Sequence, residues 1–217
     1  MADFCVIGLG IFGRSVALGL AAEGQSVLGV DADQDEVDRM ASELDTVVCA
    51  DATDEDALRE LRIDRFGCIV VAIGAESMEA SILVTALLRQ LGVPQIVARS
   101  LDPLHARVLR SVGAHQVVSP EWEMGERLAR QLAQPSVLER FDLGDEVEVA
   151  ELEVPQSFVG KTLIELEVRR RYGVSVAAVR RGEHVVAALE GDEHFRSGDV
   201  LVIIGRAPAI AELAALA

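Results

Sequence analysis

The chain has 217 residues, half of them hydrophobic, and a formal net charge of −16. This acidic balance argues against binding to nucleic acid and to anionic bilayers, because both need a basic surface. The sequence lacks an uncharged stretch of the roughly 18 residues that a membrane span needs, and it lacks a basic segment before an apolar N-terminal core, so we expect neither a membrane helix nor a signal peptide. Cys5, Cys49 and Cys68 lie in apolar runs without C-x-x-C spacing, which indicates reduced, structural, cytosolic thiols.

The first apolar run, Phe4–Ile7, leads into the motif Gly8-x-Gly10-x-x-Gly13 and then into an Ala/Leu-rich helical pattern. A strand, a tight turn and a helix N-terminus in this order form the phosphate site of dinucleotide-binding folds. The glycine motif alone is weak evidence, because glycines also serve ordinary turns. The predicted phosphate loop comprises Gly8, Leu9, Gly10, Ile11, Phe12 and Gly13.

Short runs rich in Val, Ile and Ala alternate with charged segments of helical length over the first two-thirds of the chain. The predicted strands are Phe4–Ile7, Ser26–Val30, Thr46–Cys49, Cys68–Ile73, Gln95–Arg99 and Gln116–Val118. Helices are predicted to begin near Ile11, Gln34, Asp54, Ser77 and Asp102. Apolar runs without alternation are typical of parallel strands that helices cover on both faces. The sequence therefore predicts an α/β fold with a Rossmann-type doubly wound parallel sheet.

Polar and small residues follow three of these strands, at the sheet edge where ligands of open α/β sheets bind. Asp31 follows the second strand, where a carboxylate accepts hydrogen bonds from ribose hydroxyls and repels a 2′-phosphate; the alternative is a helix N-cap. Small residues at the other strand ends allow a flat adenine to approach the backbone. The predicted site residues at these ends are Asp31, Ala32, Asp51, Ala52, Thr53, Ala72, Ile73 and Gly74.

A different pattern begins after Ser119-Pro120. The helical segment Glu121–Ala133 carries Met124, Leu128 and Leu132 on one stripe, which requires a covering partner. The range Glu139–Glu146 resembles a charged connector. Strands are predicted at Val147–Val154, Val174–Arg180, His184–Leu189 and Val200–Ile204, with helices near Thr162–Arg171 and from Pro208 onward. We therefore predict a nucleotide-binding domain over 1–119, a crossover helix and linker over 120–143, and a small α+β domain over 144–217.

The sequence carries no acid/base arrangement for catalysis. Lys161 and Tyr172 are the only lysine and tyrosine, and their order excludes a Tyr-x-x-x-Lys hydride-transfer pair. The four histidines are scattered, and no serine lies in a G-x-S-x-G turn. A nucleotide site without such groups favours sensing over turnover. The alternatives are an NAD-dependent oxidoreductase and an assembly subunit whose nucleotide never exchanges.

Several segments, in this order, resemble the RCK-domain proteins of the TrkA/KtrA group, which are cytosolic regulators of potassium uptake channels. They are FCVIGLGIFGRSVA, VDAD, CADATDEDALRELRI, VVAIGAESMEAS, RVLRSVGAHQVVSPEWEMG and VGKTLIELEVRRRYGVSVAAVRRG with SGDVLVIIG. One copy of each subdomain is similar to the KtrA type. The resemblance implies a non-enzymatic regulatory subunit that binds ATP, ADP or NAD(H). It also implies a dimer-based octameric ring, docked at the cytoplasmic face of the membrane on a TrkH/KtrB-like potassium-translocating subunit.

The resemblance also implies roles for individual residues. Phosphates would lie at Gly8, Gly10, Phe12 and Gly13, ribose at Asp31, and adenine near Asp51, Ala52, Ile73 and Gly74. Arg99 matches a phosphate contact, although a surface strand end would also explain it. Glu121 matches a carboxylate that holds a divalent or monovalent cation near the phosphates, although a favourable acid in a first helical turn would also explain it. The stripe on Glu121–Ala133 matches the helix that crosses between subunits.

Two departures from the family pattern affect the expected ligands. Ile11 stands where relatives carry an arginine that reaches a terminal phosphate, so we expect weak discrimination between ATP and ADP. In the C-terminal domain, Arg169 matches a basic residue of a cyclic di-AMP pocket, but Ala187-Ala188-Leu189-Glu190 lacks the expected prolines. A dimer interface without a ligand is the alternative there.

Overall fold

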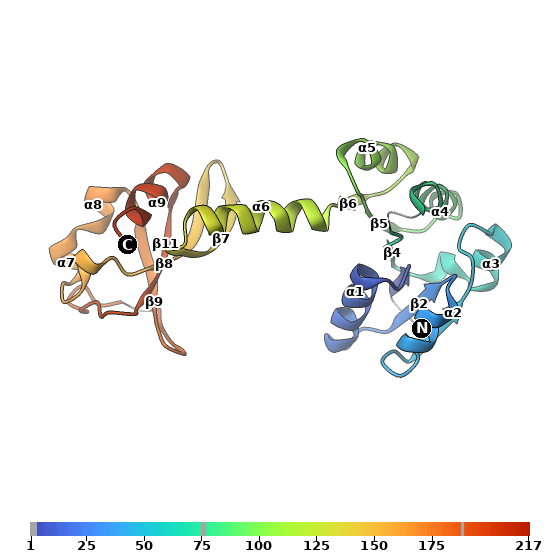
Figure 1. Cartoon of the computed structure of the whole chain (residues 1–217), viewed down its shortest axis with the longest axis horizontal. Coiled ribbons are helices and arrows are strands. Elements are labelled where there is room, and N and C mark those ends of the chain that lie inside the picture. The colour runs from blue at the N-terminus through green and yellow to red at the C-terminus, as the bar shows by residue number, and fades with distance from the viewer. Residues whose placement is uncertain (1–3, 75–76, 188) are drawn as a thin grey trace. The chain divides into compact units, whose positions relative to one another are not determined.

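Six parallel strands form the sheet of the N-terminal part of the chain in the computed structural model (Figure 1). The structure describes residues 4–74, 77–187 and 189–217, and the chain divides into two units between Met124 and Gly125. The strands of the first unit are β1 (Phe4–Ile7), β2 (Val27–Asp31), β3 (Thr46–Cys49), β4 (Cys68–Val71), β5 (Gln95–Arg99) and β6 (Gln116–Val118). Their order, β3-β2-β1-β4-β5-β6, is that of a doubly wound nucleotide-binding sheet and confirms the predicted fold class.

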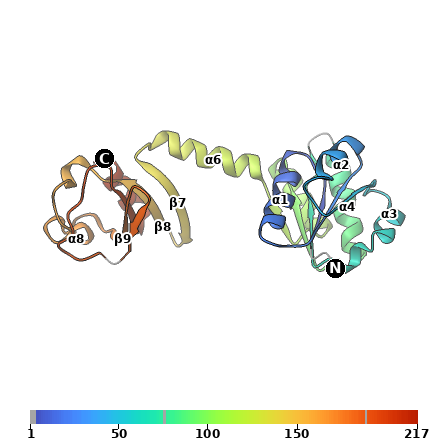
Figure 2. The ribbon, with the colours of Figure 1, turned by 90° about the horizontal axis from the view of Figure 1, so that it is seen from below.

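Helices cover both faces of this sheet, because alternate strand residues point to opposite sides (Figures 1 and 2). On one face, α1 (Ile11–Ala22) and α2 (Gln34–Met40) pack on residues such as Val6 and Val70. On the other face, α3 (Glu55–Glu60), η1 (Ile63–Arg65), α4 (Met78–Gln90) and α5 (Pro103–Val112) pack on residues such as Ile7 and Val71. Burial on both faces explains why these strands are apolar without alternation.

Aspartates mark the starts of three helices in the first unit. Asp33, Asp54 and Asp102 are N-caps whose side chains accept hydrogen bonds from backbone N–H groups in the first turns of α2, α3 and α5. Gly113 ends α5 with φ +119°, a conformation that favours glycine. Ala75 and Glu76, which the sequence places just before α4, lie outside the described residues.

The second unit is built on a five-stranded antiparallel sheet in the order β10-β9-β11-β8-β7. Its elements, which follow α6 (Pro120–Ala133), are β7 (Val137–Gly144), β8 (Val147–Glu153), η3 (Gln156–Phe158), α7 (Leu163–Leu166), α8 (Val168–Tyr172), β9 (Ser175–Arg181), β10 (His184–Val186), β11 (Val200–Arg206) and α9 (Ala207–Ala214). Leu152, Leu201, Phe158 and Phe195 lie in one buried core. The predicted small α+β architecture is confirmed.

Three local predictions for this unit are wrong or lie partly outside the structure. The range Glu139–Glu146 is not a connector: β7 occupies most of it and pairs with β8, because Asp145 and Glu146, both at positive φ, close a tight hairpin turn. The predicted helix near Thr162–Arg171 is broken into α7 and α8 at Glu167, which has φ +47°. The strand predicted over His184–Leu189 ends at Val186, and Ala188 lies outside the described residues.

The three cysteines are free in the structure. Cys5 is fully buried, and burial raises the pKa of its thiol, as it does for the partly buried Cys68. A raised pKa keeps a thiol protonated and unreactive. Cys49 differs, because its side chain is exposed at the end of β3. The prediction that the cysteines have a structural role therefore fits Cys5 and Cys68 better than Cys49.

Candidate nucleotide-binding site

A cleft of about 1270 Å³ opens at the carboxyl ends of β1 to β5, within the first unit. It includes the topological switch point between β1 and β4, where open α/β sheets bind ligands. Most predicted site residues line it: Gly8, Gly10, Ile11, Phe12, Asp31, Ala32, Asp51, Ala52, Thr53, Ala72, Ile73, Gly74, Arg99 and Glu121. Leu9 and Gly13 do not, because both are buried.

The glycine loop allows α1 to lie directly against the strand ends. Gly8 has φ +94°, and a Cβ there would lie 3.0 Å from the backbone of Ala72 and Ile73. A Cβ on Gly13 would lie 1.8 Å from the carbonyl oxygen of Gly8, so only glycine fits. Gly10 is the N-cap of α1 and has open space around it. The first N–H groups of α1 thus face the cleft with no side-chain cap, which is the arrangement that binds phosphate.

Asp31 links the end of β2 to the glycine loop. Its two carboxylate oxygens accept hydrogen bonds from Leu9 N at 2.5 Å and Asp33 N at 2.9 Å. The N-cap of α2 is Asp33, whose side chain accepts from Asp35 N, so the N-cap alternative for Asp31 is wrong. Each carboxylate oxygen has a second lone pair, and Asp31 lines the cleft, so it can still accept hydrogen bonds from a ligand.

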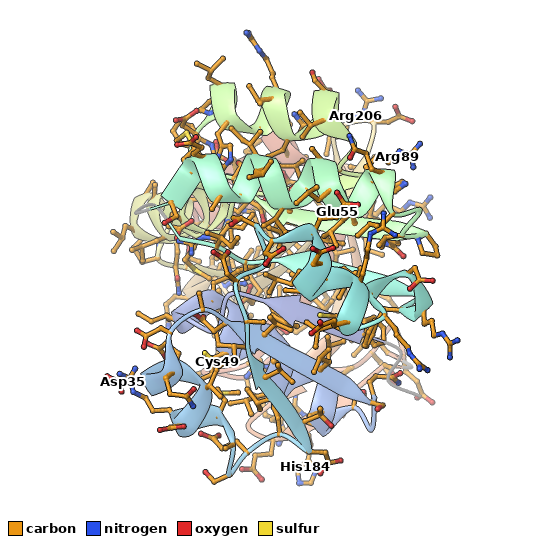
Figure 3. All side chains as sticks on the ribbon, turned by 90° about the vertical axis from the view of Figure 1, so that its right-hand side faces the viewer. Asp35, Cys49, Glu55, Arg89, His184 and Arg206 are labelled. Atoms are coloured by element: carbon orange, nitrogen blue, oxygen red, sulfur yellow. The ribbon has the colours of Figure 1, made fainter. Side chains whose placement is uncertain are left out.

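Asp51 occupies the corresponding position after β3. It accepts hydrogen bonds from Thr53 Oγ1 at 2.7 Å and Thr53 N at 2.9 Å. These two bonds hold the pKa of the Asp51 carboxyl below its usual value, so the group is ionised at neutral pH. Figure 3 labels Cys49, the residue of β3 that pairs with Asp31; its sulfur lies 3.6 Å from the carbonyl oxygen of Ala32. An exposed thiol therefore lies beside this end of the cleft.

Arg99 and Glu121 meet at the other end of the cleft. The Arg99 guanidinium, at the end of β5, forms an ion pair with the Glu121 carboxylate in the first turn of α6 and lies 5.7 Å from the centre of the Phe12 ring. Within the described part of the chain, Arg99 Nε is buried and has no hydrogen-bond partner. Three or more potential metal ligands do not come together anywhere among those residues, so Glu121 would need oxygens from a ligand to hold a cation.

Small residues and carboxylates make up much of the cleft lining. No histidine, lysine, cysteine or tyrosine is among the described residues that line it. Several further residues line the cleft that were not predicted as site residues from the sequence, including Ser15, Asp33, Glu36, Ser77, Ala80, Pro120 and Met124. Asp33 and Glu36 could have been predicted to line the cleft, because they lie at the start of the helix that follows β2. Met124 was predicted only as part of the apolar stripe on the helix Glu121–Ala133.

Comparisons with known proteins agree with this geometry. Residues 4–120 match the TrkA-N domain and residues 149–217 match the TrkA-C domain. The Ktr system potassium uptake protein C of Bacillus subtilis is 36% identical over 94% of this chain and 91% of its own length. The Ktr system potassium uptake protein A of Vibrio alginolyticus is 34% identical over 94% of this chain and 92% of its own length.

Solved structures share the fold. The RCK domain of GsuK covers 99% of this chain and 47% of its own, with a TM-score of 0.69 and 22% identity. A structure of the GsuK channel bound to NAD has a TM-score of 0.66 and covers 99% of this chain and 39% of its own. A helix long and apolar enough to cross a membrane is not found in the described ranges. Domain order, full-length similarity and the glycine-loop cleft lead to one conclusion: the chain belongs to the TrkA/KtrA family of RCK-domain proteins of potassium uptake systems.

Proposed function

We propose that this protein is the nucleotide-sensing regulatory subunit of a potassium uptake system. The observation that carries the proposal is the cleft over the glycine loop, which lies in the TrkA-N segment of a chain whose full-length relatives are potassium uptake proteins. The protein acts at the cytoplasmic face of the membrane, through a TrkH/KtrB-like subunit that conducts potassium. The acidic surface fits a protein partner and not a nucleic acid.

The ligand is an adenine nucleotide, ATP, ADP or NAD(H), and the cleft residues divide its recognition among them. Gly10 and the first turn of α1 hold phosphates through backbone N–H groups, and Gly8, whose N–H donates to the Val30 carbonyl oxygen, shapes the loop beneath them. Asp31 accepts hydrogen bonds from the ribose, and small residues such as Ala52 and Gly74 leave room for adenine. Arg99 supplies a cation, with its buried Nε available to a phosphate oxygen. Any bound cation would be shared between Glu121 and the phosphates.

Regulation requires that the ligand bind two arrangements of the assembly with different affinity, because only that difference shifts the equilibrium between them. The exposed stripe Met124, Leu128 and Leu132 on α6 supplies a surface through which two copies join, and such dimers build the octameric ring of the family. The protein is not an enzyme in this proposal, in keeping with relatives that are potassium uptake proteins. Cyclic di-AMP stays a prediction for the second unit, where Arg169 is exposed on α8.

The test measures rubidium uptake by cells of the source organism from which this chain has been deleted. Uptake should fall on deletion and recover with the wild-type chain. It should not recover with Gly10→Leu, whose side chain would fill the space at the N-terminus of α1. Gly19→Leu is the matched control, because Gly19 is in the same helix, has open space around it and lies away from the cleft.

Two outcomes would contradict the proposal. Full recovery by Gly10→Leu, with nucleotide binding shown to be lost in calorimetry, would mean that uptake does not depend on the cleft. Turnover of NADH by the purified wild-type protein would instead support an oxidoreductase.

A further inference from the structure

The strand β7 is an edge strand of the second sheet. Figure 2 shows it, in yellow, along one margin of that sheet, and it pairs only with β8 among the strands that the structure describes. Its second half, from Phe141 to Gly144, is exposed. Proteins commonly block such an edge with proline or lysine, and β7 contains neither. The edge therefore offers backbone N–H and C=O groups to a further strand.

An apolar row crosses the face of this sheet that lies opposite the helices, and the row ends at the β7 edge. Phe141 is opposite Val149 of β8, and Val149 is opposite Ile204 of β11. The helices α7, α8 and α9 pack on the other face, where Ala150 and Leu152 are buried. Phe141 is 61% exposed and Ile204 is 37% exposed. An exposed apolar row that ends at an open edge indicates contact with a partner at that edge.

The charges on β7 favour one symmetric alignment of two such edges. The stretch that pairs with β8 without interruption comprises Glu139, Arg140, Phe141 and Asp142. Two antiparallel copies related by a twofold axis through one of these residues place that residue opposite itself. At each of the three charged positions, the axis would bring like charges directly opposite, which destabilises a pair of strands. An axis at Phe141 instead places the two rings opposite each other and Arg140 of each copy opposite Asp142 of the other.

Arg140 and Asp142 keep hydrogen-bonding capacity for this alignment. Arg140 donates through Nη1 to Glu148 Oε2 at 3.1 Å and through Nη2 to Gln134, so part of its guanidinium stays free to donate. Asp142 accepts through Oδ1 from Gly144 N at 2.8 Å, and a carboxylate has about four acceptor sites. The net charge of −16 opposes close approach of two copies in general, so a surface that pairs opposite charges is favoured for their contact.

We infer that the β7 strands of two copies of this chain pair edge to edge, antiparallel, with Phe141 on the twofold axis. The two sheets then form one continuous sheet, and the apolar rows of both copies meet at an aromatic cross-strand pair. The contact uses neither the nucleotide cleft nor the α6 stripe, so it is separate from the surface proposed above for joining copies. A short edge buries little area, so it acts in an assembly that other contacts also hold together.

The test is disulfide crosslinking of the full-length protein in a Cys49→Ala background, which removes the exposed native thiol. Opposite residues of antiparallel strands have Cα atoms about 4.5–5.5 Å apart, a distance that a disulfide spans. Phe141→Cys should therefore form a disulfide between copies under mild oxidation. Leu143→Cys is the matched control, because Leu143 is also 61% exposed. Its two copies would lie about 13 Å apart along the strands, so we expect at least tenfold less crosslinked dimer.

Lysine substitutions give a second measurement that needs no oxidation. Phe141→Lys places like charges on the axis and should weaken association tenfold or more in sedimentation velocity. Leu143→Lys places its charge opposite Glu139 of the other copy and should weaken association less than threefold. Both side chains are exposed, so neither change should unfold a single copy, and circular dichroism checks this.

Three results would overturn the inference. Equal crosslinking by the two cysteine variants, or none by either, would exclude the strand pairing. Stronger crosslinking by Leu143→Cys than by Phe141→Cys would exclude the alignment on Phe141. A crosslink from Phe141→Cys to a different protein in cells, in place of a second copy, would exclude this chain as the occupant of its own edge.

Discussion

Gly13 is the point of closest approach between α1 and the glycine loop. Gly13→Ala would place a Cβ 1.8 Å from the Gly8 carbonyl oxygen, so α1 must move. We expect this overpacking to lower the free energy of unfolding by about 1–3 kcal/mol. Gly10→Ala is the comparison, because Gly10 has φ −61° and open space for a Cβ; its stability should change by less than about 0.5 kcal/mol. Urea unfolding measures both variants, and equal losses would show that the close contact is not what requires glycine at position 13.

The carboxylate of Asp31 should select against dinucleotides with a 2′-phosphate. Repulsion between two unit charges about 4 Å apart is about 1 kcal/mol in water and about 4 kcal/mol in a partly shielded site. Wild-type protein should therefore bind NAD at least tenfold more tightly than NADP in calorimetry. Asp31→Asn should reduce this ratio, at some cost in stability, because Leu9 N and Asp33 N both donate to the carboxylate. Equal affinity of the wild type for NAD and NADP would refute this role.

A partly buried ion pair links Arg181 of β9 to Asp199, the residue before β11 in the second unit. Asp199, 1% exposed just before β11, accepts hydrogen bonds from Nε and an Nη atom of Arg181, both at 2.9 Å, and from Arg196 N at 2.8 Å. Burial raises the pKa of Asp199, but the bonds from Arg181 and Arg196 outweigh it and hold the pKa below its usual value. The folded state therefore binds fewer protons than the unfolded state at acid pH, and the pair's stabilisation is lost as the pH falls below about 3.9.

We expect Asp199→Asn to lower the free energy of unfolding at pH 7 by roughly 1.5–3 kcal/mol, because it removes hydrogen bonds to a charged group. The matched control is Asp192→Asn, at an exposed position of the same loop, which should change stability by less than about 0.5 kcal/mol. Chemical unfolding at pH 7 and pH 3 should show the difference between wild type and Asp199→Asn shrinking at the lower pH. A difference independent of pH would contradict the ionised pair.

The protein as a whole should be an obligate oligomer. The stripe Met124, Leu128 and Leu132 leaves three large apolar side chains more than half exposed in one chain. Burying each is worth roughly 1.5–3 kcal/mol before the entropy cost of association. Sedimentation velocity should show no stable monomer at micromolar concentration. The double variant Leu128→Glu with Leu132→Glu should dissociate the assembly. Arg130→Glu, on another face of α6, should leave it intact, and a wild-type monomer would refute the expectation.

Much of the first unit follows from local signals in the amino-acid sequence. Apolar strands buried on both faces, aspartates at helix starts and glycines in the loop are local signals, and each produces its element at nearly the predicted residues. The same signals placed Asp31, Asp51 and Gly74 at strand ends, and parallel strands bring their carboxyl ends to one edge. Nearly all of the cleft lining from the strand ends was therefore predictable.

The contacts that these residues make depend on the packing of segments that are distant in the sequence. Asp31 accepts a hydrogen bond from Leu9 N, a contact between β2 and the glycine loop that joins residues 22 positions apart, while Asp33 caps α2. The Arg99–Glu121 pair joins β5 to α6, a contact that no local spacing encodes. The charged run Glu139–Glu146 looked like a connector because β7 is an edge strand whose second half is exposed, and only pairing with β8 makes it part of a sheet. The spacing of apolar residues in the sequence reflects which side chains are buried, whereas these contacts depend on residues that are far apart in the sequence.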